Sequence, residues 1–175
     1  MFSTILIVLV VVIAAVLIYA ATRPNDFVTT RTATIKAAPE AIFPLINDFS
    51  RWPEWSPYEK LDPDMKRTLS GAQSGKGAVY AWEGNGKAGK GRMEIVNSMP
   101  SSLVALELDF EKPFRANNSV DFTLTTSGDT TAVSWAMRGS RPFIAKLMGL
   151  FMNFDTLIGR DFEVGLANLK RNTEA

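Results

Sequence analysis

The chain has 175 residues, 46% of them hydrophobic and 21% charged, which is typical of one globular domain with a short additional segment. Nineteen basic and eighteen acidic residues leave a net charge of +1, so the charge gives no indication of a nucleic-acid partner. The sequence contains no cysteine and no histidine, which excludes disulfides, thiolate and imidazole chemistry, and metal sites built from these residues. We therefore expect no metal and no cofactor, and acid–base chemistry would fall to Asp, Glu, Lys, Tyr or Arg.

The amino-terminal segment is continuously apolar. Residues 5–21 read ILIVLVVVIAAVLIYAA, and together with the residues before them they reach the roughly 20 residues needed to cross a bilayer. A cleaved signal peptide is the alternative, but no Lys or Arg precedes the segment, and Tyr19 or Ile18 would stand at position −3 of the cleavage site, where a small residue is expected. We predict a transmembrane anchor over residues 1–22, with residues 2–21 in the lipid bilayer, followed by a linker over 23–27 and a folded domain over 28–175.

The orientation of this single-pass anchor follows from the basic residues around it. The first of them, Arg23, Arg31 and Lys36, all lie after the apolar segment. Basic residues stay on the cytoplasmic side of a membrane, so this distribution predicts a cytoplasmic domain. Three charges are few, and an extracytoplasmic domain stays open as the alternative.

The domain is predicted to begin with a strand and two short helices. Residues 28–36, VTTRTATIK, are rich in β-branched side chains and alternate in polarity, as a strand does. Pro39 and Glu40 are typical of a helix start. Residues 51–58, RWPEWSPY, follow; two prolines prevent a long helix there, and three large aromatic side chains must pack against something.

Strand-like segments separated by turns occupy the middle of the chain. We predict strands over 66–70, 77–84, 89–97, 103–110, 118–125 and 131–138. Their short connections make neighbouring strands antiparallel. The glycine-rich residues 84–91 lack the spacing of a phosphate-binding loop and are predicted to form a hairpin turn. Alternation assigns these side chains to the buried face: Ala78, Tyr80, Trp82, Met93, Ile95, Leu106, Leu108, Phe110, Val120, Phe122, Leu124, Val133, Trp135 and Met137.

The last part of the chain is predicted to form one long amphipathic helix over residues 142–170. Its apolar residues recur at intervals of three and four. They are Ile144, Leu147, Phe151, Phe154, Ile158, Phe162, Leu166 and Leu169. The opposite, solvated face would carry Lys146, Asn153, Thr156, Arg160, Glu163 and Lys170. Such a helix needs a wide sheet to cover its apolar face, and the two either meet in a filled core or leave a ligand cavity between them.

Two segments carry a resemblance to a known family. Residues 35–55, IKAAPEAIFPLINDFSRWPEW, and residues 162–170, FEVGLANLK, are similar to the polyketide-cyclase/dehydrase branch of the START-like (SRPBCC) superfamily. The resemblance covers about residues 27–172. It implies an α+β helix-grip fold, in which a curved antiparallel sheet of about seven strands wraps around a long carboxy-terminal helix and leaves a hydrophobic pocket. No catalytic residue of the family maps onto this sequence.

The candidate ligand-binding residues are mostly aromatic. Large side chains with a polar atom either fill the core or line a cavity and orient an apolar ligand. Asp155 lies at the edge of the apolar stripe. It points either to water or toward the sheet, where it would need Arg92 or Arg115 as a partner, or else a raised pKa. The complete predicted lining is Trp52, Trp55, Tyr58, Tyr80, Trp82, Met93, Leu108, Phe122, Trp135, Phe151, Asp155 and Phe162.

Three functions stay open from the sequence. The first is a membrane-tethered binding domain for a small hydrophobic ligand that resembles a lipid, an isoprenoid or a polyketide. The second is a cyclase or dehydratase that uses Tyr, Asp or Glu for acid–base chemistry, and the third is a non-catalytic interaction module for an unidentified membrane protein. The lack of histidine and of an evident carboxylate pair favours binding over catalysis.

Overall fold

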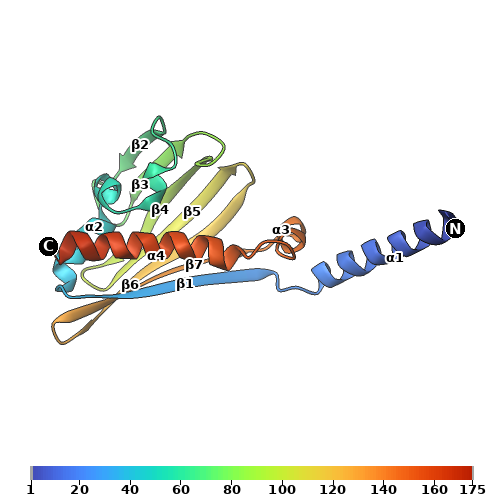
Figure 1. The fold of residues 1–175 in the computed structure, drawn as a ribbon. Helices are drawn as coiled ribbons and strands as arrows, with labels where there is room; N and C mark the ends of the chain where they lie inside the picture. The colour runs from blue at the N-terminus through green and yellow to red at the C-terminus, as the bar shows by residue number, and fades with distance from the viewer. Residues whose placement is uncertain (1, 175) are drawn as a thin grey trace.

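The computed structural model describes residues 2–174, which form one amino-terminal helix and an α+β domain (Figure 1). The elements in chain order are α1 (Phe2–Ala21), β1 (Asp26–Ile35), α2 (Pro39–Asn47), the short 3-10 helices η1 (Phe49–Glu54) and η2 (Pro57–Lys60), β2 (Lys66–Gly71), β3 (Ala78–Glu83), β4 (Lys90–Met99), β5 (Leu103–Lys112), β6 (Ala116–Ser127), β7 (Thr130–Ser140), α3 (Phe143–Met148) and α4 (Phe154–Thr173).

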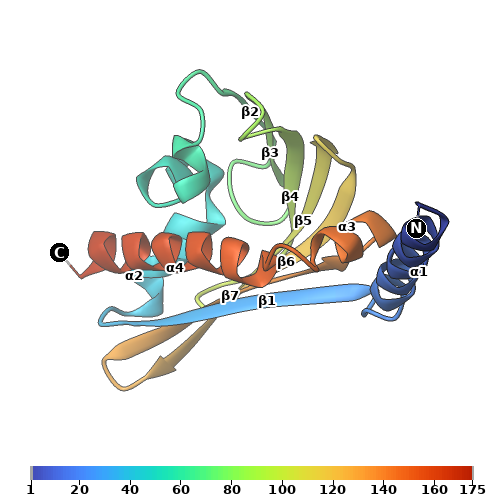
Figure 2. The ribbon, with the colours of Figure 1, turned by 45° about the vertical axis from the view of Figure 1, so that its right-hand side comes forward.

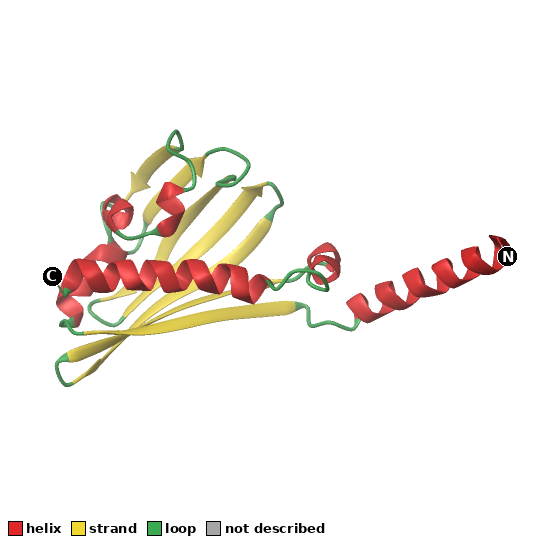
Figure 3. Cartoon of the chain, in the orientation of Figure 1, coloured by secondary structure: helices red, strands yellow, loops and turns green. Residues whose placement is uncertain are grey.

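The seven strands form a single antiparallel sheet in the order β1-β7-β6-β5-β4-β3-β2. β1 is the one strand out of sequence order, since it pairs with β7 and places Asp26 opposite Ser140. A register shift between Ile95 and Asn97 interrupts the pairing of β4 with β5, and irregularities of this kind let a sheet bend. The bent sheet cradles α4, as Figures 2 and 3 show, which confirms the predicted helix-grip architecture.

The core lies between α4 and the face of the sheet that the alternation predicts. Inward side chains such as Phe122 and Val133 are completely buried, as are Phe162 and Leu166 from α4. The indole of Trp135 on β7 stacks on the Phe162 ring, with the ring centroids 4.0 Å apart and the planes 8° from parallel. Helix and sheet come this close because α4 has a glycine, Gly165, where it crosses Trp135.

The predicted single helix over 142–170 is wrong, because the chain breaks it into α3 and α4. The N–H of Gly149 donates to the carbonyl of Ala145 at 2.9 Å and ends α3. The side-chain oxygen of Asn153 then accepts from the N–H of Thr156 at 3.1 Å and caps the start of α4. The apolar spacing continues across this break, so periodicity alone does not reveal it. The cap residue and the glycine are the local signals that do.

Helix α1 extends away from the domain, as Figures 1 and 2 both show. This helix of 20 residues is long and apolar enough to cross a membrane. Most of its side chains are exposed, whereas Ala20 is buried at the end where α1 contacts α3. The helix therefore presents to its surroundings the surface that a bilayer accommodates.

The contact at Gly165 can be tested by adding one methyl group. A Cβ at this position would lie 2.7 Å from Cζ3 of Trp135 and 3.2 Å from Cδ of Pro57. We expect Gly165→Ala to lower the free energy of unfolding by about 1–3 kcal/mol, because overpacking exceeds the gain of about 1 kcal/mol in helix propensity. Urea unfolding of the full chain in mild detergent measures this.

Gly86→Ala is the matched control, because a Cβ at Gly86 meets nothing within 4 Å. That variant should unfold like the unmodified chain. A Gly165→Ala protein that is as stable as the unmodified chain would show that α4 does not press on Trp135.

Candidate ligand-binding cavity

A cavity of about 400 Å³ lies between the sheet and the first half of α4. It exists because α4 packs over the β1 and β7 side of the sheet, as the contacts between these elements show, and leaves the inward face of β3 to β5 partly uncovered. Inward residues Met93, Leu108 and Phe110 are accordingly only half-buried, whereas Trp135 on β7 is buried. The volume is typical of a site for a small molecule.

Trp52 and the segment of η1 and η2 close one side of the cavity, and Trp55 supports Trp52 from behind. The indole N–H of Trp52 donates to the carbonyl of Ile46 at 3.0 Å, and that of Trp55 donates to the carbonyl of Leu45 at 2.8 Å. These bonds fix the aromatic segment against the end of α2. Trp52 faces the cavity, and Trp55 packs behind it at a centroid distance of 5.0 Å.

Three buried polar atoms at the cavity have no hydrogen-bond partner within residues 2–174. They are the hydroxyl oxygen of Ser56, the amide oxygen of Asn118 and the indole nitrogen of Trp135, and all three residues line the cavity. An unpaired buried polar group costs about 1–3 kcal/mol. All three atoms are covered by neighbouring protein atoms, so a ligand in the cavity could pair with them only if their side chains reorient.

A buried carboxylate forms another polar part of the wall. Glu59 accepts a hydrogen bond from the Tyr80 hydroxyl at 2.6 Å and one from Nε of Arg67 at 2.5 Å. Burial and the Glu59 carboxylate together raise the pKa of Tyr80 well above its usual value, with burial the larger cause. Tyr80 therefore stays a neutral hydroxyl that is committed to Glu59.

Asp161 and Tyr58 form a second pair, between α4 and η2. Burial raises the pKa of the Asp161 carboxyl above its usual value, although hydrogen bonding with the Tyr58 hydroxyl acts in the opposite direction. The pKa of Tyr58 is raised as well, chiefly by its own burial and then by the charge of Asp161. Asp161 is thus a cavity-lining carboxyl whose pKa is raised by burial.

Eight of the twelve predicted lining residues surround this cavity. They come from η1, η2, four strands and α4, and are Trp52, Tyr58, Tyr80, Trp82, Met93, Leu108, Trp135 and Phe162. Whether these side chains contact a ligand stays a prediction.

The other four predicted residues lie elsewhere. Trp55 and Phe122 are buried in the core behind the lining, because the rings in front of them form the cavity surface. Phe151 is 82% exposed, since it lies in the break between α3 and α4 and not on a helix that faces the sheet. Asp155 lies outside the cavity in the first turn of α4.

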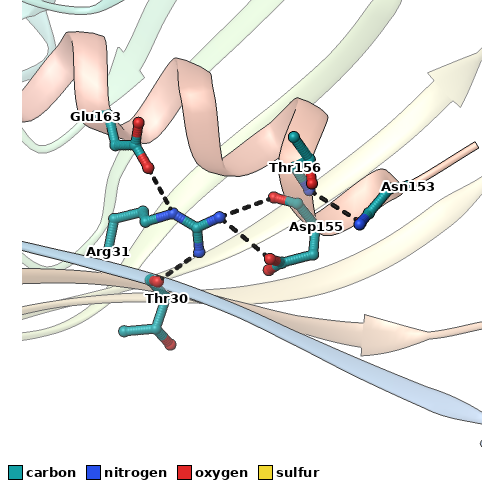
Figure 4. Close-up of polar contacts among 6 residues, drawn as sticks. All are labelled: Thr30, Arg31, Asn153, Asp155, Thr156 and Glu163. Atoms are coloured by element: carbon teal, nitrogen blue, oxygen red, sulfur yellow. Dashed lines mark hydrogen bonds and ion pairs between the residues drawn. The ribbon is translucent and has the colours of Figure 1, made fainter.

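Asp155 pairs with Arg31 on β1 (Figure 4) and not with Arg92 or Arg115. Nη2 of Arg31 lies 3.1 Å from the Asp155 carboxylate. Its Nε lies 2.8 Å from the carboxylate of Glu163, which is about two turns further along the same face of α4. A Cβ on Gly159 would lie 2.0 Å from Nη2 of Arg31, so the guanidinium fills the space that this glycine leaves. Arg31 thus attaches the outer edge of α4 to β1.

Several lining residues were not predicted from the sequence. Asn118 lies in the inward-facing register of β6, two residues before Val120. A polar residue at an inward position could have indicated a cavity there. Asp161 lies three residues after Ile158 on the same helical face, which was a second signal. Ser56 and Glu59 lie in irregular segments that carry no periodic signal. Between residues 2 and 174, acidic side chains form no group of three that could hold a metal ion.

Comparison with known proteins agrees with this geometry. Residues 26–174 match the family model described as polyketide cyclase / dehydrase and lipid transport. Among curated proteins, none matches this chain significantly in sequence.

Solved structures share the fold at low sequence identity. A crystal structure of a Chromobacterium violaceum protein matches with a TM-score of 0.59 and 13% identity, and covers 87% of this chain and 99% of that one. The Aha1 dimer from Colwellia psychrerythraea matches with a TM-score of 0.60 and 17% identity, over 85% and 96% of the two chains. A Thermobifida fusca protein matches with a TM-score of 0.61 and 22% identity, over 83% of this chain and 92% of that one.

The Arg31 pairing makes a pH-dependent prediction for Asp155→Asn. Hydrogen bonding to Arg31 is the largest cause that holds the pKa of Asp155 below its usual value. A carboxylate with a lowered pKa in the folded state stabilises the fold above its unfolded pKa of about 4, and the contribution is lost as the pH falls through the folded pKa. Urea unfolding should therefore show Asp155→Asn to be less stable than the unmodified chain at neutral pH, with the difference shrinking in acid.

Asp129→Asn controls for the loss of one surface carboxylate, because Asp129 lies 3.9 Å from Lys36 and is 77% exposed. Its stability should stay close to that of the unmodified chain at neutral pH. An Asp155→Asn deficit that does not shrink in acid would mean that the ion pair is not its cause.

Proposed function

We propose that this chain, which belongs to the polyketide cyclase/dehydrase and lipid transport family, is a membrane-tethered binding domain for a small hydrophobic ligand. The ligand would be lipid-like, isoprenoid-like or polyketide-like. It would occupy the cavity between the sheet and α4, with the soluble domain on the cytoplasmic side of the membrane.

The observation that carries this proposal is a cavity with a mostly apolar wall that contains a few polar side chains. Side chains such as Met93, Leu106 and Leu108 supply apolar surface, whose removal from water favours binding at about 25 cal/mol per Å². Side chains such as Tyr58, Asn118 and Asp161 supply the polar part of the lining. A mostly apolar molecule with one polar group at its end matches this distribution.

Tethering supports the proposal because it changes the affinity that is needed. Only the residues from Thr22 to Asn25 separate α1 from β1, so the domain would stay near the bilayer surface. Apolar molecules concentrate in the bilayer, and a tethered site meets them at a high effective concentration. A cavity of modest affinity is then sufficient.

Ligand uptake can be measured with the natural tryptophans. Three of the four tryptophans, Trp52, Trp82 and Trp135, line the cavity, and α1 contains none. We expect dibrominated stearic acid to quench the tryptophan fluorescence of the full chain in phospholipid vesicles, in a saturable manner, whereas unbrominated stearic acid should compete. Quenching that rises without saturation would contradict a discrete site.

A pair of variants on β6 separates the cavity from the rest of the surface. Ala116 lines the cavity, whereas Thr123 lies on the opposite face of the same strand and is exposed. Ala116→Phe should weaken quenching by about tenfold or more, equivalent to at least about 1.4 kcal/mol, because the ring occupies ligand volume. Thr123→Phe should bind like the unmodified chain, and equal effects of both substitutions would contradict binding in the cavity.

An enzymatic role is the second candidate, and Asp161 is the observation that favours it. A carboxyl with a raised pKa beside a tyrosine on a cavity wall is suited to proton transfer to or from an enolisable substrate. The test compares Asp161→Asn with the unmodified chain in two measurements. One is binding, read from saturable quenching by dibrominated stearic acid, and the other is turnover of an enolisable substrate. A binding protein keeps its ligand and shows no turnover of an enolisable polyketide-like substrate in either form, whereas an enzyme loses turnover in the variant.

A further inference from the structure

Helix α3 has inverted polarity for a helix of a soluble domain. Its one charged residue, Lys146, was expected on the solvated face but is 8% exposed, whereas Phe143 and Ile144 are 46% and 63% exposed. Within residues 143–152, five large apolar side chains face outward. Together with Phe114 in the β5–β6 loop they form what we call the apolar rim: Phe114, Phe143, Ile144, Met148, Phe151 and Met152. Large apolar patches of this kind mark an interaction surface.

The buried lysine fixes α3 beside the anchor. Nζ of Lys146 donates to the side-chain oxygen of Asn25 at 2.5 Å. The backbone N–H of Arg141 donates to the backbone carbonyl of Asn25. Asn25 belongs to the short linker that follows α1, and Ala20 near the end of α1 is completely buried where α1 contacts α3. The carboxy-terminal end of α1 and helix α3 are therefore in contact at one end of the domain (Figure 2).

The mouth of the cavity is at this same end. The strand pairing shows which strand ends lie together. Asp26 at the start of β1 is opposite Ser140 at the end of β7, and the start of β6 pairs with the end of β7 and with the end of β5. Lys112 at the end of β5 is opposite Lys90 at the start of β4. The β3–β4 and β5–β6 loops consequently lie at the end from which α1 departs. Three exposed residues of the cavity lining, Lys87, Pro113 and Phe114, belong to these two loops. The fourth, Leu61, follows η2 beside the β3–β4 loop, where the N–H of Asn85 donates to Asp62.

We propose that the apolar rim lies in the interface of the bilayer that α1 spans, so that the cavity mouth opens onto lipid and not onto water. This inference rests on the tether of the proposed function and adds the direction of the domain and the route of the ligand. A hydrophobic ligand would pass from the bilayer into the cavity beside α3 and Phe114 without crossing the aqueous phase.

Continuity with α1 is the reason to choose a bilayer over a protein partner. The rim is the apolar surface next to the carboxy-terminal end of a helix that suits the hydrocarbon, and that end marks where the headgroup region begins. A surface helix with its apolar face outward lies about 5–10 Å deep in the boundary between headgroups and acyl chains. Burial of exposed phenylalanine and isoleucine side chains there removes their cost in water.

The cysteine-free sequence allows a direct test of depth. Ile144→Cys, Phe151→Cys and Ser127→Cys variants of the full chain each accept one environment-sensitive fluorophore, with Ser127 at the exposed far end of β6 as the control. They are reconstituted in phosphatidylcholine vesicles with and without lipid that carries a shallow nitroxide quencher. We expect about twofold or greater quenching at positions 144 and 151 and little at 127, because only the rim lies at quencher depth.

The outcomes separate this inference from the proposed function. Chains that fail to float with vesicles would overturn the tether itself. Chains that float and still bind dibrominated stearic acid, but show no more quenching at 144 and 151 than at 127, would overturn the docked rim alone. Disulfide crosslinking between two chains at position 144 without lipid quenching would assign the rim to a second copy of the chain, and would also overturn the proposal.

A rate measurement tests the route of the ligand. Ile144→Ser with Phe151→Ser should slow the transfer of dibrominated stearic acid from vesicles to the cavity by several-fold and leave equilibrium quenching unchanged. Leu69→Ser with Val164→Ser is the matched control, since both residues are 51% exposed and lie outside the rim. Equal transfer rates in the two double variants would overturn the lipid-facing route.

Discussion

The contact between α4 and β7 is the constraint on which the rest of the structure depends. The Phe162 ring stacks on the Trp135 indole, and the absence of a side chain at Gly165 lets the helix backbone approach that indole. Arg31 holds the outer edge of the helix to β1 through Asp155 and Glu163. Because α4 is attached along this side of the bent sheet, it cannot also cover the inward face of β3 to β5. The cavity is the space that this one-sided attachment leaves.

The polarity of the cavity follows from the same arrangement. Trp135 must present its ring to Phe162, and in this orientation its indole nitrogen finds no partner within residues 2–174. Glu59, by contrast, is satisfied by Tyr80 and Arg67 and serves as a fixed part of the wall. The wall thus combines committed polar groups with uncommitted ones. The uncommitted atoms are covered by neighbouring protein atoms, so they would gain a hydrogen bond to a ligand only if their side chains reorient.

The break between α3 and α4 allows α3 to contact α1 and the linker that follows it. A continuous helix over 142–170 would have carried Ile144 and Phe151 toward the sheet, where they would have joined the core. The cap at Asn153 separates them from α4, and Lys146 turns inward to the linker residue Asn25. The apolar side chains of this segment then face outward beside α1, at the end of the domain where the cavity opens.

The sequence by itself determined the seven strands, their inward faces, the helix-grip order and the apolar helix α1, because each of these is encoded by a local period of two or by an unbroken apolar segment. It also placed most of the aromatic residues of the cavity wall on the inward face, since residues such as Tyr80 and Trp82 keep the inward phase of their strand. Only the tertiary structure decided which inward residues face the cavity and which, like Phe122, are buried behind it, because that depends on where α4 crosses the sheet. The partner of Asp155 and the outward direction of Phe151 were decided in the same way. The partner of Asp155 depends on a contact between segments more than a hundred residues apart. The direction of Phe151 depends on the cap at Asn153, which interrupts a continuing apolar period. Neither feature leaves a periodic signal in the sequence.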